Sequence, residues 1–271
     1  MVANEILNRK GARKAQDIPN DVLLLLNKGE IETVNLTEWL TINQIELISN
    51  TFSNVGLTKH IDKLKEGLNQ LKKTSTMSSI KFVGETLYSI CSKNGTLSSV
   101  IDKLSNHKSD TLRCYATYLI SLNSQLNIEE KLNASLNLIT DKHFGVREIV
   151  WMALRPEIEK ELNKSIRILS LWTSNSDENV RRFTTEVIRP RGVWCKHIES
   201  LKEKPEQALP ILEKLKSDKS KYVQNSVGNW LNDASKTKPE FIIELCQKWK
   251  VDCQTKATEK IIKRALRTIE K

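Results

Sequence analysis

The chain has 271 residues, with 43 lysines and arginines against 33 acidic residues and a formal net charge of +10. This excess of positive charge favours an anionic partner, and the longest apolar run, Val22 to Leu26, is far too short to span a bilayer. Five cysteines without a CxxC pair or a histidine at ligand spacing argue against a zinc site and a disulfide framework.

Composition and periodicity both predict an all-α fold. Glycine and proline are few, at nine and six residues, and no stretch alternates apolar and polar side chains over several strand-like lengths. No linker is long enough to divide the chain, so we expect a single domain over residues 1–271. The odd cysteine count, without a recognisable signal peptide, fits a reducing cytoplasm.

Residues 1–35 are expected to form a basic, helical N-terminal arm. Arg9 and Arg13 would share one helical face, as would Lys10 and Lys14, and this face could contact phosphate or simply be a basic surface. After the break at Ile18-Pro19, Asn35 is expected to cap a helix that runs to about residue 50. Further helices are predicted at 58–73, 77–91, 97–104, 111–122 and 128–138.

The stretch 140–236 contains three helices of one design, and we expect it to carry the functional site. The first two end at Arg155-Pro156 and Arg189-Pro190, since the residue before proline disfavours helix. Beside its apolar stripe, each helix carries a second line of side chains. These lines are Phe144, Glu148, Trp151 and Arg155; Asn179, Arg182, Glu186 and Arg189; and Asn225, Asn229, Asp233 and Lys236.

The spacing of these helices fits helix-pair repeats of HEAT type. Glu148 precedes Glu186 by 38 residues, and Glu186 precedes Asp233 by 47, close to the roughly 40 to 47 residues of such repeats. Equivalent helices would stack, and their polar lines would form one groove. Plainer helices are expected at 157–173 and 205–215, and helices at 239–249 and 255–269 would close the array.

Arginines gather on or beside these lines, where they could bind phosphate bidentately. They stand at 147, 155, 181, 182, 189 and 191, and Trp194 follows closely. The sequence offers neither a Gly-rich phosphate loop nor a Ser-His or Cys-His pattern. A purine alkylated at a ring nitrogen would suit the remaining groups, because its positive charge already weakens the glycosidic bond. A carboxylate would then stabilise the sugar cation or orient water, although other anionic ligands also fit.

Several motifs resemble the HEAT-like-repeat alkylpurine DNA glycosylases of AlkC and AlkD type. They are Asp17-Ile-Pro19; Glu30 with Asn35-Leu-Thr-Glu-Trp-Leu40; Met152-Ala-Leu-Arg-Pro156; Asn179-Val-Arg-Arg182; Glu186-Val-Ile-Arg-Pro-Arg191 with Trp194; and Ser226-Val-Gly-Asn-Trp-Leu-Asn-Asp233. The resemblance implies a right-handed α-solenoid whose concave basic face binds double-stranded DNA containing alkylated bases. It further implies release of 3- or 7-alkylated purines without metal or cofactor, and we expect a monomer.

The resemblance also assigns candidate site residues. By analogy with the AlkD branch, the catalytic carboxylate is Glu148, four residues after the aromatic Phe144. In the AlkC branch a glutamate stands at the position of Trp151, whereas Asp233 and Trp194 match site residues of that branch. The catalytic candidates are therefore Glu148, Asp233, Trp194 and Trp151. The expected DNA contacts are Arg147, Arg155, Arg181, Arg182, Glu186, Arg189, Arg191, Asn225, Asn229 and Lys236.

Alternatives stay open at this point. Glu148 could pair with a neighbouring arginine, and Glu186 could orient Arg182 or Arg189 rather than take part in chemistry. The chain could be a glycosylase, a non-catalytic relative that binds branched or damaged DNA, or a HEAT scaffold for proteins. The clustering of arginines argues against the scaffold.

Overall fold

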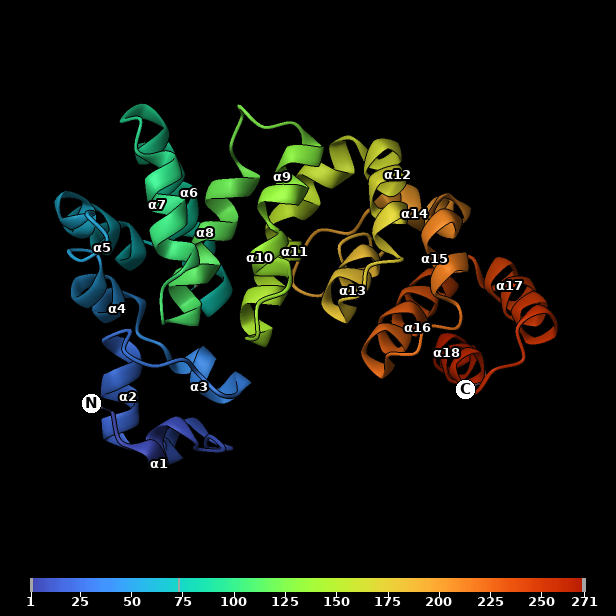
Figure 1. The fold of residues 1–271 in the computed structure, drawn as a ribbon, viewed down its shortest axis with the longest axis horizontal. Helices are drawn as coiled ribbons and strands as arrows, with labels where there is room; N and C mark the ends of the chain where they lie inside the picture. The colour runs from blue at the N-terminus through green and yellow to red at the C-terminus, as the bar shows by residue number, and fades with distance from the viewer. Residues whose placement is uncertain (1, 73, 270–271) are drawn as a thin grey trace. The chain divides into compact units, whose positions relative to one another are not determined.

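The computed structural model describes residues 2–72 and 74–269, and within them all regular structure is helical (Figure 1). The all-α prediction is confirmed. Contacts divide the chain into two compact units: unit 1 comprises Met1–Leu126 with Asp141–Ala153, and unit 2 comprises Asn127–Thr140 with Leu154–Lys271. One division falls inside helix α11 (Phe144–Lys160), so the single domain expected from the absence of a linker has an internal division that composition does not reveal.

Unit 1 consists of short helices followed by longer ones. They are α1 (Asn4–Leu7), η1 (Ala15–Asp17), α2 (Asn20–Asn27), α3 (Leu36–Thr41), α4 (Gln44–Thr51), η2 (Thr58–His60), α5 (Ile61–Asn69), α6 (Thr76–Lys93), α7 (Leu97–Ser105), α8 (Asp110–Ser121) and the first part of α11. Asn35 caps α3 as expected, by accepting a hydrogen bond from the Glu38 amide. The single helix predicted to residue 50 is wrong, because Asn43 accepts bonds from the Ile45 and Glu46 amides and starts a second helix.

The N-terminal arm differs from the prediction. Residues 9–14 are not helical, so the shared basic faces do not form. Instead, Arg9 reaches Glu38 with Nε at 2.9 Å and Nη2 at 2.7 Å and also donates to the Ile6 and Glu32 carbonyls. This arginine therefore attaches the arm to unit 1.

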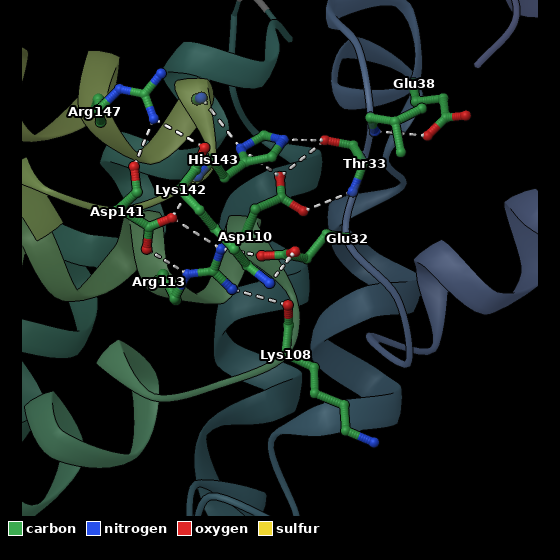
Figure 2. Close-up of polar contacts among 12 residues, drawn as sticks. Glu32, Thr33, Glu38, Lys108, Asp110, Arg113, Asp141, Lys142, His143 and Arg147 are labelled. Atoms are coloured by element: carbon green, nitrogen blue, oxygen red, sulfur yellow. Dashed lines mark hydrogen bonds and ion pairs between the residues drawn. The ribbon is translucent and has the colours of Figure 1, made fainter. Parts of the chain in front are cut away.

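A buried polar network in unit 1 holds the start of α11 (Figure 2). The Gly145 amide donates to Nδ1 of His143 at 3.1 Å, so Nε2 carries the proton and donates to the Thr33 hydroxyl at 2.9 Å. That hydroxyl in turn donates to Asp110 at 3.1 Å, and the Thr33 amide donates to the other carboxylate oxygen at 3.0 Å. Burial raises the pKa of Asp110.

Unit 2 contains α9 (Ile128–Ala134), α10 (Leu136–Ile139), the second part of α11, α12 (Leu162–Trp172), α13 (Glu178–Glu186), α14 (Glu199–Glu203), η3 (Pro205–Ala208), α15 (Leu209–Leu215), α16 (Lys221–Ser235), α17 (Pro239–Asp252) and α18 (Lys256–Leu266). The predicted helix end at Arg155-Pro156 is wrong, because α11 continues through Pro156 to Lys160. The predicted apolar stripes of α13 and α16 are buried.

The same polar contact recurs at the start of several helices. Arg113, Arg147 and Arg181 are each the fourth residue of a helix and are 34 residues apart. Each donates to the carbonyls six and five residues earlier. In α16 the equivalent position is Gln224, which donates to the Asp218 carbonyl. Each side chain thus fixes the loop that leads into its own helix.

Candidate functional site

Two carboxylates of unit 2 share one arginine. Arg189, just beyond α13, donates to Oδ2 of Asp233 on α16 from Nε at 2.9 Å and from Nη2 at 2.6 Å. Its Nη1 lies 3.4 Å from Oε2 of Glu186, at the end of α13. Both carboxylates are buried. The polar lines predicted on these two helices therefore meet, and Glu186, Arg189 and Asp233 form what we call the carboxylate–arginine cluster.

Glu186 is also held from α16 and from its own helix. The Ser226 hydroxyl donates to its Oε1 at 2.8 Å, and Arg182 approaches the same oxygen at 3.6 Å. The guanidinium of Arg182 lies 4.3 Å above the ring of Tyr222, within the range of a cation–π contact. The structure thus agrees with the alternative in which Glu186 orients Arg182 and Arg189.

The charge state of Arg189 is secured by its neighbours. Burial alone would lower the pKa of this guanidinium, but the charges of Glu186 and Asp233 outweigh it, and the pKa is raised. The cluster therefore holds a permanent cation between two carboxylates. This guanidinium keeps its charge and holds both carboxylates in place.

Trp194 stands out in the segment that follows α13. Its side chain is 62% exposed, and it is the one residue other than glycine, among those described, with a positive φ, 60°. Left-handed backbone is costly for a bulky residue and is often found at functional sites. Arg191, three residues earlier, donates to the Asp233 carbonyl at 3.2 Å, which connects this segment to the cluster.

Glu148 and Trp151 belong to unit 1 and form a pair one helical turn apart. The indole nitrogen of Trp151 donates to Oε2 of Glu148 at 2.9 Å. The Trp151 ring lies in the core, with 2% exposed, so it does not line a groove as its place on the polar line predicted. What Trp151 offers instead is a hydrogen bond that orients the Glu148 carboxylate.

Besides Arg189, three arginines expected to contact DNA are engaged within the protein. Arg147 donates to the carbonyls of Asp141 and Lys142. Arg181 is buried and pairs with Asp218 through Nε at 2.6 Å and Nη2 at 3.0 Å. Arg155 is buried and donates to three backbone carbonyls. Periodicity placed these arginines on or beside the polar lines but could not show that backbone carbonyls bind them.

The remaining expected contacts differ in their surroundings. Asn225 is exposed. Asn229 accepts from Arg264 of α18 at 3.4 Å, and the Lys236 ammonium lies 3.5 Å from Oδ1 of Asp233. Sequence reasoning missed Tyr222, Ser226 and Arg264. Ser226 stands 40 residues after Glu186, near the expected repeat length, and this spacing was the available signal.

Among residues 2–72 and 74–269, no three or more His, Cys, Asp or Glu side chains gather as a metal would require. Within the same residues no helix is both long and apolar enough to cross a membrane.

Comparison with known proteins yields a family and a fold. The family described as DNA alkylation repair enzyme matches residues 116–267, more than half of the chain. The uncharacterised protein YhaZ of Bacillus subtilis is 43% identical over 119 residues, which are 44% of this chain and 33% of YhaZ. The chain therefore spans about a third of this curated relative.

Two solved structures share the fold. The Pseudomonas fluorescens alkylpurine DNA glycosylase AlkC, solved bound to DNA containing an abasic site analog, matches with a TM-score of 0.70 and 24% identity over 84% of this chain and 62% of its own. AlkD2 from Streptococcus mutans matches with a TM-score of 0.61 and 23% identity over 77% of this chain and 96% of its own. The chain thus has the helical-repeat fold of these proteins.

Proposed function

Because the chain belongs to the DNA alkylation repair enzyme family, we propose that it is a monofunctional DNA glycosylase. It releases purines alkylated at N3 or N7 from double-stranded DNA by hydrolysis of the N-glycosidic bond, and it works as a monomer. The net charge of +10 agrees with a polyanionic substrate.

The observation that carries this proposal is the carboxylate–arginine cluster, joined through Arg189 and Arg191 to the segment that exposes Trp194. The aromatic face of Trp194 attracts a cationic base or sugar by roughly 0.5 to 2 kcal/mol. Arg182 and Arg191 bind phosphates of the same strand. These are the contacts that an alkylated nucleotide needs.

The chemistry requires little beyond these groups. An alkylated purine already carries a positive charge, so it leaves without a general acid. A carboxylate then stabilises positive charge on the sugar or orients the attacking water. Asp233 is a candidate because Arg189 binds only its Oδ2, while Oδ1 has Lys236 at the longer distance of 3.5 Å. Glu148, oriented by Trp151, is the second candidate.

One feature favours a second function, the binding of branched or damaged DNA without base release. Both carboxylates of the cluster are occupied by arginine, and Ser226 also holds Glu186. A carboxylate held in this way stabilises the protein and presents arginines to DNA without taking part in catalysis.

Release of 3-methyladenine and 7-methylguanine from methylated duplex DNA by purified protein tests the proposal. Asp233→Asn and Glu148→Gln are assayed in parallel, together with Glu85→Gln, which alters an exposed carboxylate on α6 as a matched control. We expect release by the wild type and by Glu85→Gln, and a loss of at least about 100-fold in the variant that lacks the catalytic carboxylate.

Binding measured on the same samples separates the two functions. Gel retardation of duplex and four-way-junction DNA should change little in Asp233→Asn if its carboxylate acts in chemistry. If the wild type retards DNA, prefers junctions and frees no base, the protein is a DNA-structure binder and the glycosylase proposal fails.

A further inference from the structure

Arg155 holds the segment that exposes Trp194. Only 2% of this arginine is exposed. Its Nε donates to the Lys196 carbonyl at 2.9 Å, Nη1 donates to the Val187 carbonyl at 3.0 Å, and Nη2 donates to the Arg189 carbonyl. One side chain therefore binds the backbone both before and after Trp194.

The segment also packs closely against the guanidinium. A Cβ atom at Gly192 would lie 3.2 Å from Cζ of Arg155 and 2.2 Å from Sγ of Cys195. The backbone between Arg189 and Lys196 therefore curves around Arg155 with no room for a side chain at position 192. This curve ends in the left-handed turn at Trp194, with φ of 60°.

Burying this arginine carries a cost in free energy. Burial lowers the pKa of Arg155 because it disfavours the charged form. The Val187 carbonyl, at the C-cap of α13, offsets part of this cost, because the C-terminal end of a helix attracts positive charge. The guanidinium uses a different nitrogen for each of the three carbonyls, and a lysine, whose donors all sit on one nitrogen, cannot reproduce this spread.

We propose that Arg155 is a positioning residue that sets the orientation of the Trp194 indole toward DNA. The inference rests on the proposed function of Trp194 as the aromatic contact of the alkylated nucleotide. Arg155 itself is buried and does not touch the substrate. By binding the three carbonyls, Arg155 fixes the strained turn in the free protein. DNA binding then loses less conformational entropy, because the segment is already ordered.

The test uses Arg155→Lys, Trp194→Phe and the double variant in the full chain. Single-turnover base release and duplex affinity are measured for each variant. The fluorescence emission and acrylamide quenching of Trp194 are obtained as the difference between each protein and the same protein carrying Trp194→Phe. Arg113→Lys in unit 1 is the matched control, because Arg113 is also a buried arginine that holds loop carbonyls. Thermal melting identifies variants that fail to fold.

We expect Arg155→Lys to slow base release by about 10- to 100-fold, since small displacements of a positioning group have effects of this size. The Trp194 difference spectrum should shift, and quenching should change. In the Trp194→Phe background, Arg155→Lys should slow release by less than about twofold, because the two substitutions remove the same interaction. Arg113→Lys should lower the melting temperature without altering the Trp194 spectrum.

Two outcomes overturn the proposal. One is an unchanged Trp194 spectrum in folded Arg155→Lys, and the other is an equal loss of rate in both backgrounds. If the wild type frees no base, the proposed function fails, but the spectrum of free protein and its change on adding duplex DNA still decide whether Arg155 orients Trp194. Should Arg155→Lys not fold, Gly192→Ala in a Cys195→Ala background provides a second test, because without Sγ of Cys195 the added methyl group meets the Arg155 guanidinium.

Discussion

Arg189 places two hydrogen bonds on a single oxygen of Asp233, at 2.9 and 2.6 Å, and thereby joins the end of α13 to α16. Its removal leaves two buried carboxylates without their shared cation. We expect Arg189→Met to lower the free energy of unfolding by about 3 kcal/mol or more, as measured by urea denaturation. Lys164→Met, which breaks an exposed pair with Glu161, should have little effect. Equal losses in the two variants would contradict the structural role of the cluster.

The salt dependence of DNA binding should separate cations that solvent reaches at least in part from those buried in the fold. Each phosphate contact contributes a slope of about 0.9 in the logarithm of affinity against the logarithm of salt concentration. Arg191→Gln and Lys236→Gln should each reduce the slope by roughly this amount. Arg181→Gln should leave the slope unchanged and lower stability, because Arg181 is buried against Asp218. A reduced slope for Arg181→Gln would mean that this arginine reaches DNA after all.

Glu32 should make unit 1 sensitive to acid. Burial by itself raises the pKa of Glu32, but hydrogen bonds from Lys142 and Arg113 outweigh it, and the pKa lies below its ordinary value of 4.5. A lowered pKa means that the unfolded chain binds the proton more readily. The stabilisation is therefore present above pH 4.5 and lost as the pH falls through the folded-state pKa. In denaturation between pH 6 and pH 3, wild type should lose stability more steeply than Glu32→Gln, whereas Glu85→Gln should parallel wild type; identical curves would refute the linkage.

Pro156 is a further site at which stability can be measured. It is exposed and lies inside α11, where a proline removes one hydrogen bond and crowds the preceding turn. Pro156→Ala should therefore raise the free energy of unfolding, by up to about 3 kcal/mol. A decrease would contradict this expectation. Thermal and urea denaturation of the two proteins provide the comparison.

Most of the fold can be predicted from hydrophobic periodicity, since apolar spacing alone predicts the buried stripes of α13 and α16. Its failures have local causes. Pro156 is expected to end a helix, but the helix continues to Lys160. In this last part of α11, Glu157 forms an ion pair with Lys131 at 2.6 Å. The helix predicted from Asn35 divides because Asn43 binds two amides of its own next turn, a side-chain contact that hydrophobic spacing does not report.

The candidate site was predicted in part. The spacing of Glu186 and Asp233 placed them on equivalent helices, and the structure joins them through Arg189. Two other arginines beside the polar lines do not reach the surface: Arg155 and Arg181 are buried and donate to backbone carbonyls. A sequence shows that an arginine lies beside a polar line, but not which carbonyls lie within its reach. The exposure of Trp194 and the burial of Trp151 depend on the same tertiary information.

The arginines at positions 113, 147 and 181 bind carbonyls only five and six residues upstream, so each helix carries its own means of attachment to the preceding loop. Duplication or loss of a whole 34-residue segment would leave every such arginine with its own carbonyls. A single residue inserted between the loop and the arginine would move the loop carbonyls out of reach of the guanidinium. Insertions elsewhere leave the contact intact: Gln224 keeps it although it follows Arg181 by 43 residues rather than 34.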